Sequence, residues 1–358
     1  MNVKALNSLS LAAALFFNFN GTAVAGGFQC LGLVQPSEGN PTGEISKIVK
    51  AEDGAWLIGA ETGLFWLDSA GLKPLTTTEA DAIRSADVIV DAGDSWLIGA
   101  RNRLFRLGAT GVTKLPPLDG SAIGTVREIV DAGNGTWLIG TSTGPFTPTG
   151  RLFWLDYTGL KQIPTTDGTA ITDFFQIVDV GGGNWLIGTS PGGFSDEEMV
   201  SGLYRLIAAG LDPVLTSDEN GTSAVFQIED AGKDSWLIGA NAGLFRLDAT
   251  GLTGPHALDG SATGKVLKIV RAEDDAWLIG AEKGLFRLNA AGSEPLLTTE
   301  SGAIRSANVI VDAGENSWLI GAANGLFRLG ATGLTKLPPL DGSAIGRVRK
   351  IVDVGAGT

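Results

Sequence analysis

Residues 88–107 read VIVDAGDSWLIGARNRLFRL, and this stretch contains three short apolar runs separated by turn-forming residues. The runs are Val88–Val90, Trp96–Gly99 and Leu104–Leu107, and a weaker fourth run at 111–115 ends at two prolines. Short apolar runs bounded by Gly, Asp, Asn and Pro are typical of β-strands joined by tight turns. No window shows helical spacing without an interrupting Gly or Pro. One unit therefore predicts four short antiparallel strands.

The same unit recurs along the chain, with WLIG beginning at Trp56, Trp96, Trp137, Trp185, Trp236, Trp277 and Trp318. The Trp-to-Trp spacings are 40, 41, 48, 51, 41 and 41 residues. Four short strands in a period of about 40–45 residues are typical of one propeller blade. We therefore predict an all-β propeller of seven four-stranded blades, with the first strand of each unit nearest the axis. Eight blades or an open, truncated array are the alternatives.

The repeat also resembles a known family. The pattern V-x-x-I-x-D, then G-x-x-W-L-I-G, then G-L-F-R-L-D is similar to the two-component regulator propeller repeat, from about residue 32 to 358. The resemblance implies an exported propeller that binds a ligand as the sensor part of a signalling protein. The family has Trp–Ile–Gly where this chain has Trp–Leu–Ile–Gly, and no kinase or DNA-binding domain follows in the sequence.

Both ends of the chain carry further predictions. Residues 1–25 read as a signal peptide, with Lys4, an apolar stretch and the cleavage-site pattern Ala23-Val24-Ala25. The propeller domain would then comprise residues 26–358, exported to the periplasm or the extracellular space. Residues 272–358 nearly repeat 51–137, and 334–358 begin an eighth unit. The eighth unit indicates either truncation inside a longer array or strands that close a ring.

Composition limits the partners that we expect. The formal net charge is −13, and such a balance repels nucleic acid and anionic lipid surfaces. Cys30 is the only cysteine, so an intrachain disulfide is excluded. No later apolar run is long enough to insert the mature chain into a membrane. A small molecule, a glycan or another protein remains as partner, and the sequence implies no cofactor.

The first residues of the innermost strands vary between units and form the candidate binding site. Two residues before the conserved Ile, one unit carries Arg127; one residue before it, others carry Lys47, Gln176, Gln227 and Lys268. A propeller brings equivalent strand ends into a ring, and convergent polar groups in a concavity are the default binding-site hypothesis. Cations and amides favour an anionic or hydroxyl-rich ligand such as an acidic sugar.

Two long connections lie between the second and third strands of their units. They are Thr141–Gly150 and Thr189–Gly202, and each contains a phenylalanine, Phe146 and Phe194. Long loops on a rigid scaffold commonly carry function. We expect both loops to rise beside the variable strand ends, where the two phenylalanines either anchor the loops or contact the ligand.

Aspartates follow the innermost strand in six units: Asp91, Asp131, Asp179, Asp230, Asp312 and Asp353. A ring of carboxylates is one way to bind Ca²⁺. An Asp at a turn also accepts a hydrogen bond from the backbone two residues on. We favour the turn, and we expect no metal site.

Catalytic residues are sparse. His256 is the only histidine, so His/Cys zinc sites and Cys–His pairs are excluded, and no G-x-S-x-G elbow is present. A sialidase-type nucleophile would have to be Tyr157 or Tyr204. We therefore predict a non-enzymatic sensor or recognition module. A carbohydrate-active hydrolase or lyase and a protein–protein scaffold are the competing classes.

Overall fold

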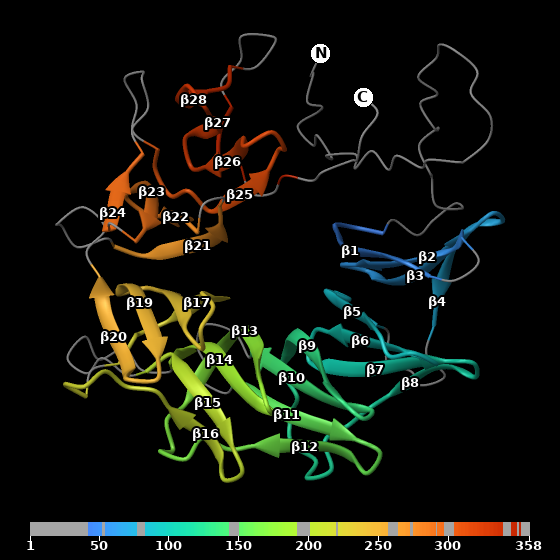
Figure 1. Cartoon of the computed structure of the whole chain (residues 1–358). Helices are drawn as coiled ribbons and strands as arrows, with labels where there is room; N and C mark the ends of the chain where they lie inside the picture. The colour runs from blue at the N-terminus through green and yellow to red at the C-terminus, as the bar shows by residue number, and fades with distance from the viewer. Residues whose placement is uncertain are drawn as a thin grey trace, which may run out of the picture.

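Seven sheets of four antiparallel strands fan around a common centre in the computed structural model (Figure 1). The structure describes residues 42–51, 54–76, 83–142, 150–191, 201–219, 221–256, 264–272, 275–290, 292–296, 304–338, 345–348 and 351. Every sheet is a meander of four consecutive strands, so each sheet is one blade of a β-propeller. The prediction of seven blades is confirmed.

The strands fall into four sets by their place in the blade. The innermost strands of blades 1 to 7 are β1 (Ile45–Lys50), β5 (Val88–Asp91), β9 (Thr125–Gly133), β13 (Ile171–Gly181), β17 (Val225–Asp230), β21 (Val266–Arg271) and β25 (Val309–Asp312). The second strands are β2 (Trp56–Ala60), β6 (Trp96–Ala100), β10 (Thr136–Ser142), β14 (Asn184–Pro191), β18 (Trp236–Ala240), β22 (Trp277–Ala281) and β26 (Trp318–Ala322). The third strands are β3 (Gly63–Asp68), β7 (Arg103–Gly108), β11 (Arg151–Asp156), β15 (Leu203–Ile207), β19 (Gly243–Asp248), β23 (Gly284–Asn289) and β27 (Gly325–Gly330). The rim strands are β4 (Gly71–Leu75), β8 (Gly111–Lys114), β12 (Gly159–Ile163), β16 (Gly210–Pro213), β20 (Gly251–His256), β24 (Gly292–Pro295) and β28 (Gly333–Lys336).

Blades 2 to 6 are buried on both faces, because alternate residues of WLIG pack against the preceding blade and the following blade. On β18, Leu237 joins a buried cluster with blade 6, whereas Ile238 joins one with blade 4. Six such clusters tie the seven blades in sequence. The seven Trp side chains of WLIG are not equally buried. Three are buried (Trp137, Trp185, Trp277), and the other four are half-buried.

The Gly of WLIG is present because the next blade packs onto it. A Cβ on Gly59 would stand 2.0 Å from the carbonyl oxygen of Ala86, and one on Gly280 would stand 2.2 Å from that of Ala307. At Gly140 the nearest atom is the Cβ of Phe174, at 2.9 Å. The repeated Gly thus sets the close approach of one blade to the next.

The aspartates at the ends of the innermost strands close the turns into the second strands. Asp91 accepts a hydrogen bond from the backbone N–H of Gly93 at 2.8 Å, two residues on. The same bond is made by the equivalent residues Asp131, Asp179, Asp230 and Asp312. The turn interpretation is confirmed for these five, and Asp353 lies outside the described residues.

The start of an eighth unit packs on blade 7 in the place that an innermost strand would take. Val348 donates its backbone N–H to the carbonyl of Ala322 at 3.0 Å, and its side chain lies against Gly321. Among the described residues, the outer cluster of blade 1 draws all of its side chains from blade 1 itself, and the sheets of blades 1 and 7 lie apart in Figure 1. The described chain is therefore a succession of seven blades with the beginning of one more.

Candidate functional site

The innermost strands of blades 3 and 4 are longer than those of the other blades. β9 has nine residues and β13 has eleven, whereas β5 and β25 have four each. The second strands lengthen with them, so that Ser142 pairs with Thr125 and Pro191 pairs with Ile171. The stems of both long connections thus lie beside the starts of the innermost strands, as predicted. Phe146 and Phe194 lie outside the described residues.

Arg127 bridges blades 3 and 4 at this end. Its Nε donates a hydrogen bond to Ser142 Oγ at 2.7 Å, and its Nη2 lies 4.0 Å from Asp173 Oδ1 on β13. Its side chain remains 48% exposed, so charge and donors are still presented to solvent. A guanidinium held by two partners is preorganised for recognition of an anion or a hydroxyl.

An aromatic pair continues the same end of the propeller into blades 4 and 5. The rings of Phe175 and Phe226 have centroids 5.0 Å apart and are tilted by 57°. Lys265 places its Nζ 4.0 Å from the centroid of Phe226, a cation–π distance. Phe175 is 40% exposed, which is unusual for a large apolar side chain of an inner strand. We call Arg127, Asp173, Phe175, Phe226 and Lys265 the entrance arc.

The entrance arc spans blades 3 to 5 and the segment leading into blade 6. It contains two cations and one carboxylate, and so it is net positive in a chain with a net charge of −13. Phe175 and Phe226 occupy equivalent places in adjacent blades, two residues before the conserved Ile. This contact shows directly that equivalent strand positions meet from blade to blade.

Gln176 and Gln227, two predicted site residues, hold blades together instead of facing a ligand. The amide of Gln176 donates to the carbonyl of Ile228 at 3.2 Å and accepts from its backbone N–H at 2.7 Å. Gln227 makes the same two bonds to Ile269, at 2.9 and 2.8 Å, and is only 7% exposed. We call this two-bond pairing the blade clasp, and we leave both glutamines out of the candidate site.

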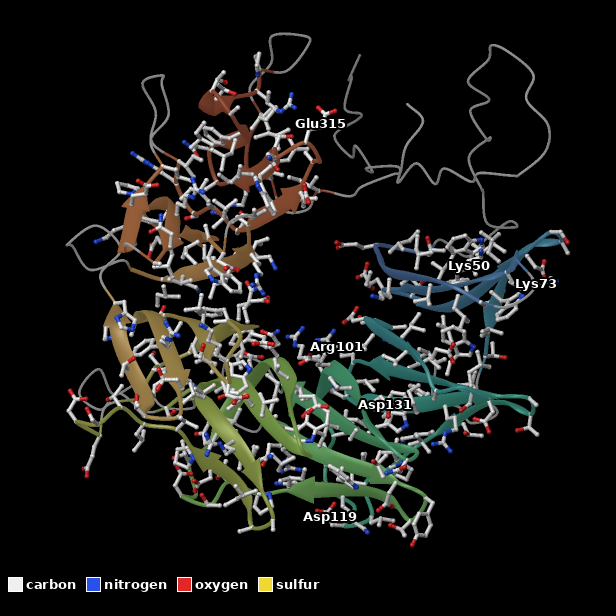
Figure 2. All side chains as sticks on the ribbon, viewed as in Figure 1. Lys50, Lys73, Arg101, Asp119, Asp131 and Glu315 are labelled. Atoms are coloured by element: carbon white, nitrogen blue, oxygen red, sulfur yellow. The ribbon has the colours of Figure 1, made fainter. Side chains whose placement is uncertain are left out.

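The other predicted residues lie where the sequence placed them, on innermost strands. Lys47 on β1 is exposed and Lys268 on β21 is half-buried. In Figure 2, Arg101, in the turn between β6 and β7, lies toward the centre of the fan, whereas Lys73 and Asp119 lie at its rim.

Glu128 on β9 occupies the position of the two clasp glutamines. Burial raises the pKa of its carboxyl from 4.5 to about 7, although a backbone hydrogen bond with Ile177 lowers it. Its Oε2 is buried and has no hydrogen-bond partner. Glu128 directly precedes the conserved Ile of its unit, at a position that varies between units, and the sequence gives no sign of its burial.

A groove lies between blades 3 and 4, near the turns at the other ends of the innermost strands. It has a volume of about 640 Å³. Its walls include Trp154, Gln162, Trp185 and the turn 207–210. We call it the lower groove. Its volume suits a small molecule, but it offers no charged side chain among its lining residues.

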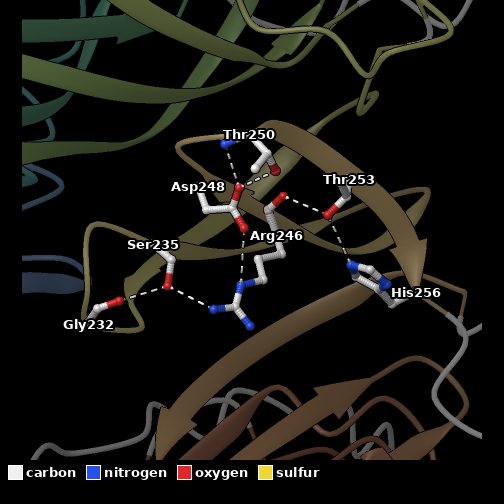
Figure 3. A network of polar contacts seen from close by, with 7 residues as sticks. All are labelled: Gly232, Ser235, Arg246, Asp248, Thr250, Thr253 and His256. Atoms are coloured by element: carbon white, nitrogen blue, oxygen red, sulfur yellow. Dashed lines mark hydrogen bonds and ion pairs between the residues drawn. The ribbon is translucent and has the colours of Figure 1, made fainter.

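The candidate catalytic residues are placed poorly for catalysis. His256 ends the rim strand β20, where its Nε2 lies 3.5 Å from Thr253 Oγ1 in a network that also holds Arg246 and Asp248 (Figure 3). Tyr204 is fully buried in the cluster between blades 3 and 4, whereas Tyr157 is 98% exposed. In the described part of the chain, no three His, Cys, Asp or Glu side chains gather closely enough to hold a metal ion.

The fold and the entrance arc define a β-propeller with one differentiated end. No model of a known family and no curated protein matches the chain. Among solved structures, the computationally designed Ika8 protein is similar with a TM-score of 0.52 and 16% identity, over 86% of this chain and 89% of that one. The Dos1 propeller matches with a TM-score of 0.51 and 10% identity, over 80% and 81%. These two likenesses confirm the propeller fold.

A further similar structure is the extracellular domain of the putative one component system BT4673 from B. thetaiotaomicron. Its TM-score is 0.47 and its identity 17%, over 83% of this chain and 39% of that chain. Among the described residues, no helix is long and apolar enough to cross a membrane.

Proposed function

We propose that this chain is an exported recognition module of the sensor type, which binds a small hydroxyl-rich or anionic ligand at the entrance arc and performs no chemistry on it. Support for export comes from the signal-peptide pattern of residues 1–25, and support for sensing comes from the resemblance of the repeat to regulator propellers.

The observation that carries the proposal is the contact between exposed Phe175 and half-buried Phe226. Lys265 lies over the ring of Phe226, and Arg127 pairs with Asp173 on the strand that carries Phe175. An aromatic surface binds the apolar face of a sugar ring, and the two cations donate hydrogen bonds to carboxylate or hydroxyl oxygens. Both kinds of contact are presented from rigid strands at the end where the two long connections begin. We therefore name acidic oligosaccharides as the ligand class.

A ligand screen tests this proposal. Thermal shift with neutral and acidic oligosaccharides, including oligogalacturonates, should identify a stabilising acidic sugar. Phe175→Ala and Phe226→Ala should then each weaken its binding by about tenfold or more in calorimetry, because the stacking surface is lost.

Two control variants locate the effect. Tyr157→Ala removes an exposed aromatic ring at a rim turn and should leave affinity unchanged. Trp154→Ala alters the lower groove. A hit that weakens with Trp154→Ala but not with either Phe substitution would move the site to the lower groove. A panel without any hit would contradict the proposed ligand class.

A further inference from the structure

Two blade clasps tie successive innermost strands together through glutamine. In each, one amide both donates to and accepts from the backbone of the conserved Ile in the next blade. Only a side chain with one donor and one acceptor at its tip can make both bonds. The clasps connect blade 4 to blade 5 and blade 5 to blade 6.

Glu128 stands at the equivalent position one blade earlier, and its backbone neighbour is the equivalent one. It directly precedes Ile129, as Gln176 precedes Ile177, and its hydrogen-bonding contact is the backbone of Ile177 in the next blade. A carboxylate accepts hydrogen bonds but cannot donate one. The ionised carboxylate can therefore accept a hydrogen bond from the Ile177 N–H, but it cannot donate one to the Ile177 carbonyl.

We propose that Glu128 is a proton-operated clasp between blades 3 and 4, which closes on the Ile177 backbone when its carboxyl takes up a proton from solvent. The carboxyl then has the donor and acceptor that the glutamine amides have, and the proton sits on the buried oxygen that otherwise lacks a partner. No other bond forms or breaks. The inference goes beyond the proposed ligand function and does not depend on it.

The surroundings of Glu128 contain no charge that would settle its state by itself. Charged side chains on the strands packed around β9 and on β9 itself are Arg103 and Arg106 on β7, Arg127 and Asp131 on β9, Asp87 and Asp91 at the ends of β5, and Asp173 and Asp179 on β13. Arg127 is already engaged by Ser142 and Asp173. The partner strand β10 carries no titratable group and places Gly140 opposite Glu128.

The expected pH dependence follows from the direction of the shift. The folded-state pKa of Glu128 lies near 7, above its ordinary value of 4.5, so the folded chain holds the proton more tightly than the unfolded chain. The stabilisation is complete below about pH 4.5 and is lost as the pH rises through about 7. Mild acid should therefore tighten the joint between the strands that carry Arg127, Asp173 and Phe175.

The test compares thermal unfolding of the wild-type chain and Glu128→Gln from pH 5 to pH 8.5. The amide keeps both bonds at every pH, so the variant should match wild type at pH 5 and exceed its Tm by roughly 5 °C at pH 8. Unfolding curves that differ by a constant amount across this range would overturn the proposal. So would failure of Glu128→Gln to fold, since this amide serves the same position in two other blades.

A reciprocal variant and a direct titration complete the test. Gln176→Glu should introduce a second loss of stability with rising pH, because it places a carboxylate beside the backbone N–H and carbonyl of Ile228. The Glu128 carboxyl carbon, identified by its absence in Glu128→Gln, should titrate near pH 7 in NMR spectra of the wild-type chain. A midpoint at the ordinary glutamate value of 4.5 would overturn the proposal.

Discussion

The first and last pairs of blades are near copies of one another, whereas blades 3 to 5 between them differ in length and in chemistry. β5 and β25 both read VIVD, and residues 51–114 recur almost unchanged at 272–336. The start of β9 recurs as well, with Arg349 and Lys350 at the places of Arg127 and Glu128. β9 and β13 are more than twice as long as these strands, and they carry Arg127, Glu128, Asp173 and Phe175. The repeated blades show what a blade needs to fold, and the central blades show what has been added to that minimum.

The comparison predicts that scaffold positions in either region respond according to their burial, while added features respond only where they occur. The largest effect should come from the Trp of WLIG. Trp185→Ala in blade 4 removes a 5% exposed side chain and should cost about 3–5 kcal/mol. Trp236→Ala, where the side chain is half-buried, should cost roughly half as much. Chemical denaturation measures both, and equal losses would show that exposure does not rank these positions.

A smaller loss should follow from filling the close approach between blades. Gly280→Ala places a methyl group 2.2 Å from the Ala307 carbonyl oxygen and should cost about 2–3 kcal/mol. Gly330→Ala is the matched control, because its Cβ would meet nothing within 4 Å and its φ is not positive. If the two variants unfolded together, the close approach would not be a packing constraint.

The smallest effect should come from the turn aspartates. Asp91→Ala in blade 2 and Asp179→Ala in blade 4 each remove one hydrogen bond to a turn N–H, of 2.8 and 2.7 Å. Each should lower the free energy of unfolding by about 0.5–1 kcal/mol, and by the same amount in the copied and the central blade. A loss confined to blade 4 would mean that Asp179 has a further role there.

Much of the fold could be predicted from the sequence because the same strand and turn pattern recurs in seven units. WLIG marks the second strand of every unit, and an Asp whose carboxylate accepts a hydrogen bond from the N–H two residues on marks the turn before it. Because the same pattern recurs in seven units, an ambiguous strand in one unit can be assigned from the others. The different exposure of the seven Trp side chains could not be predicted from the sequence, because the same residue packs against different neighbours in each blade.

The candidate site was predicted less well, because the sequence does not tell which of two adjacent residues faces the neighbouring blade. Gln227 and Phe226 are consecutive, yet the first clasps Ile269 and the second joins the entrance arc. Phenylalanine at the same place in two successive units was the signal that could have found the pair. Asp173 and Lys265 gave no signal, since their roles depend on partners in other blades.

Hydrogen exchange with a bound acidic oligosaccharide tests the central claim, that the added features of blades 3 to 5 form the binding site. Protection should appear at 125–127, 172–176 and 225–227, while the copied strands β5 and β25 should exchange as they do in the free chain. Protection confined to 162–164 and 206–210, which line the lower groove, would contradict the claim.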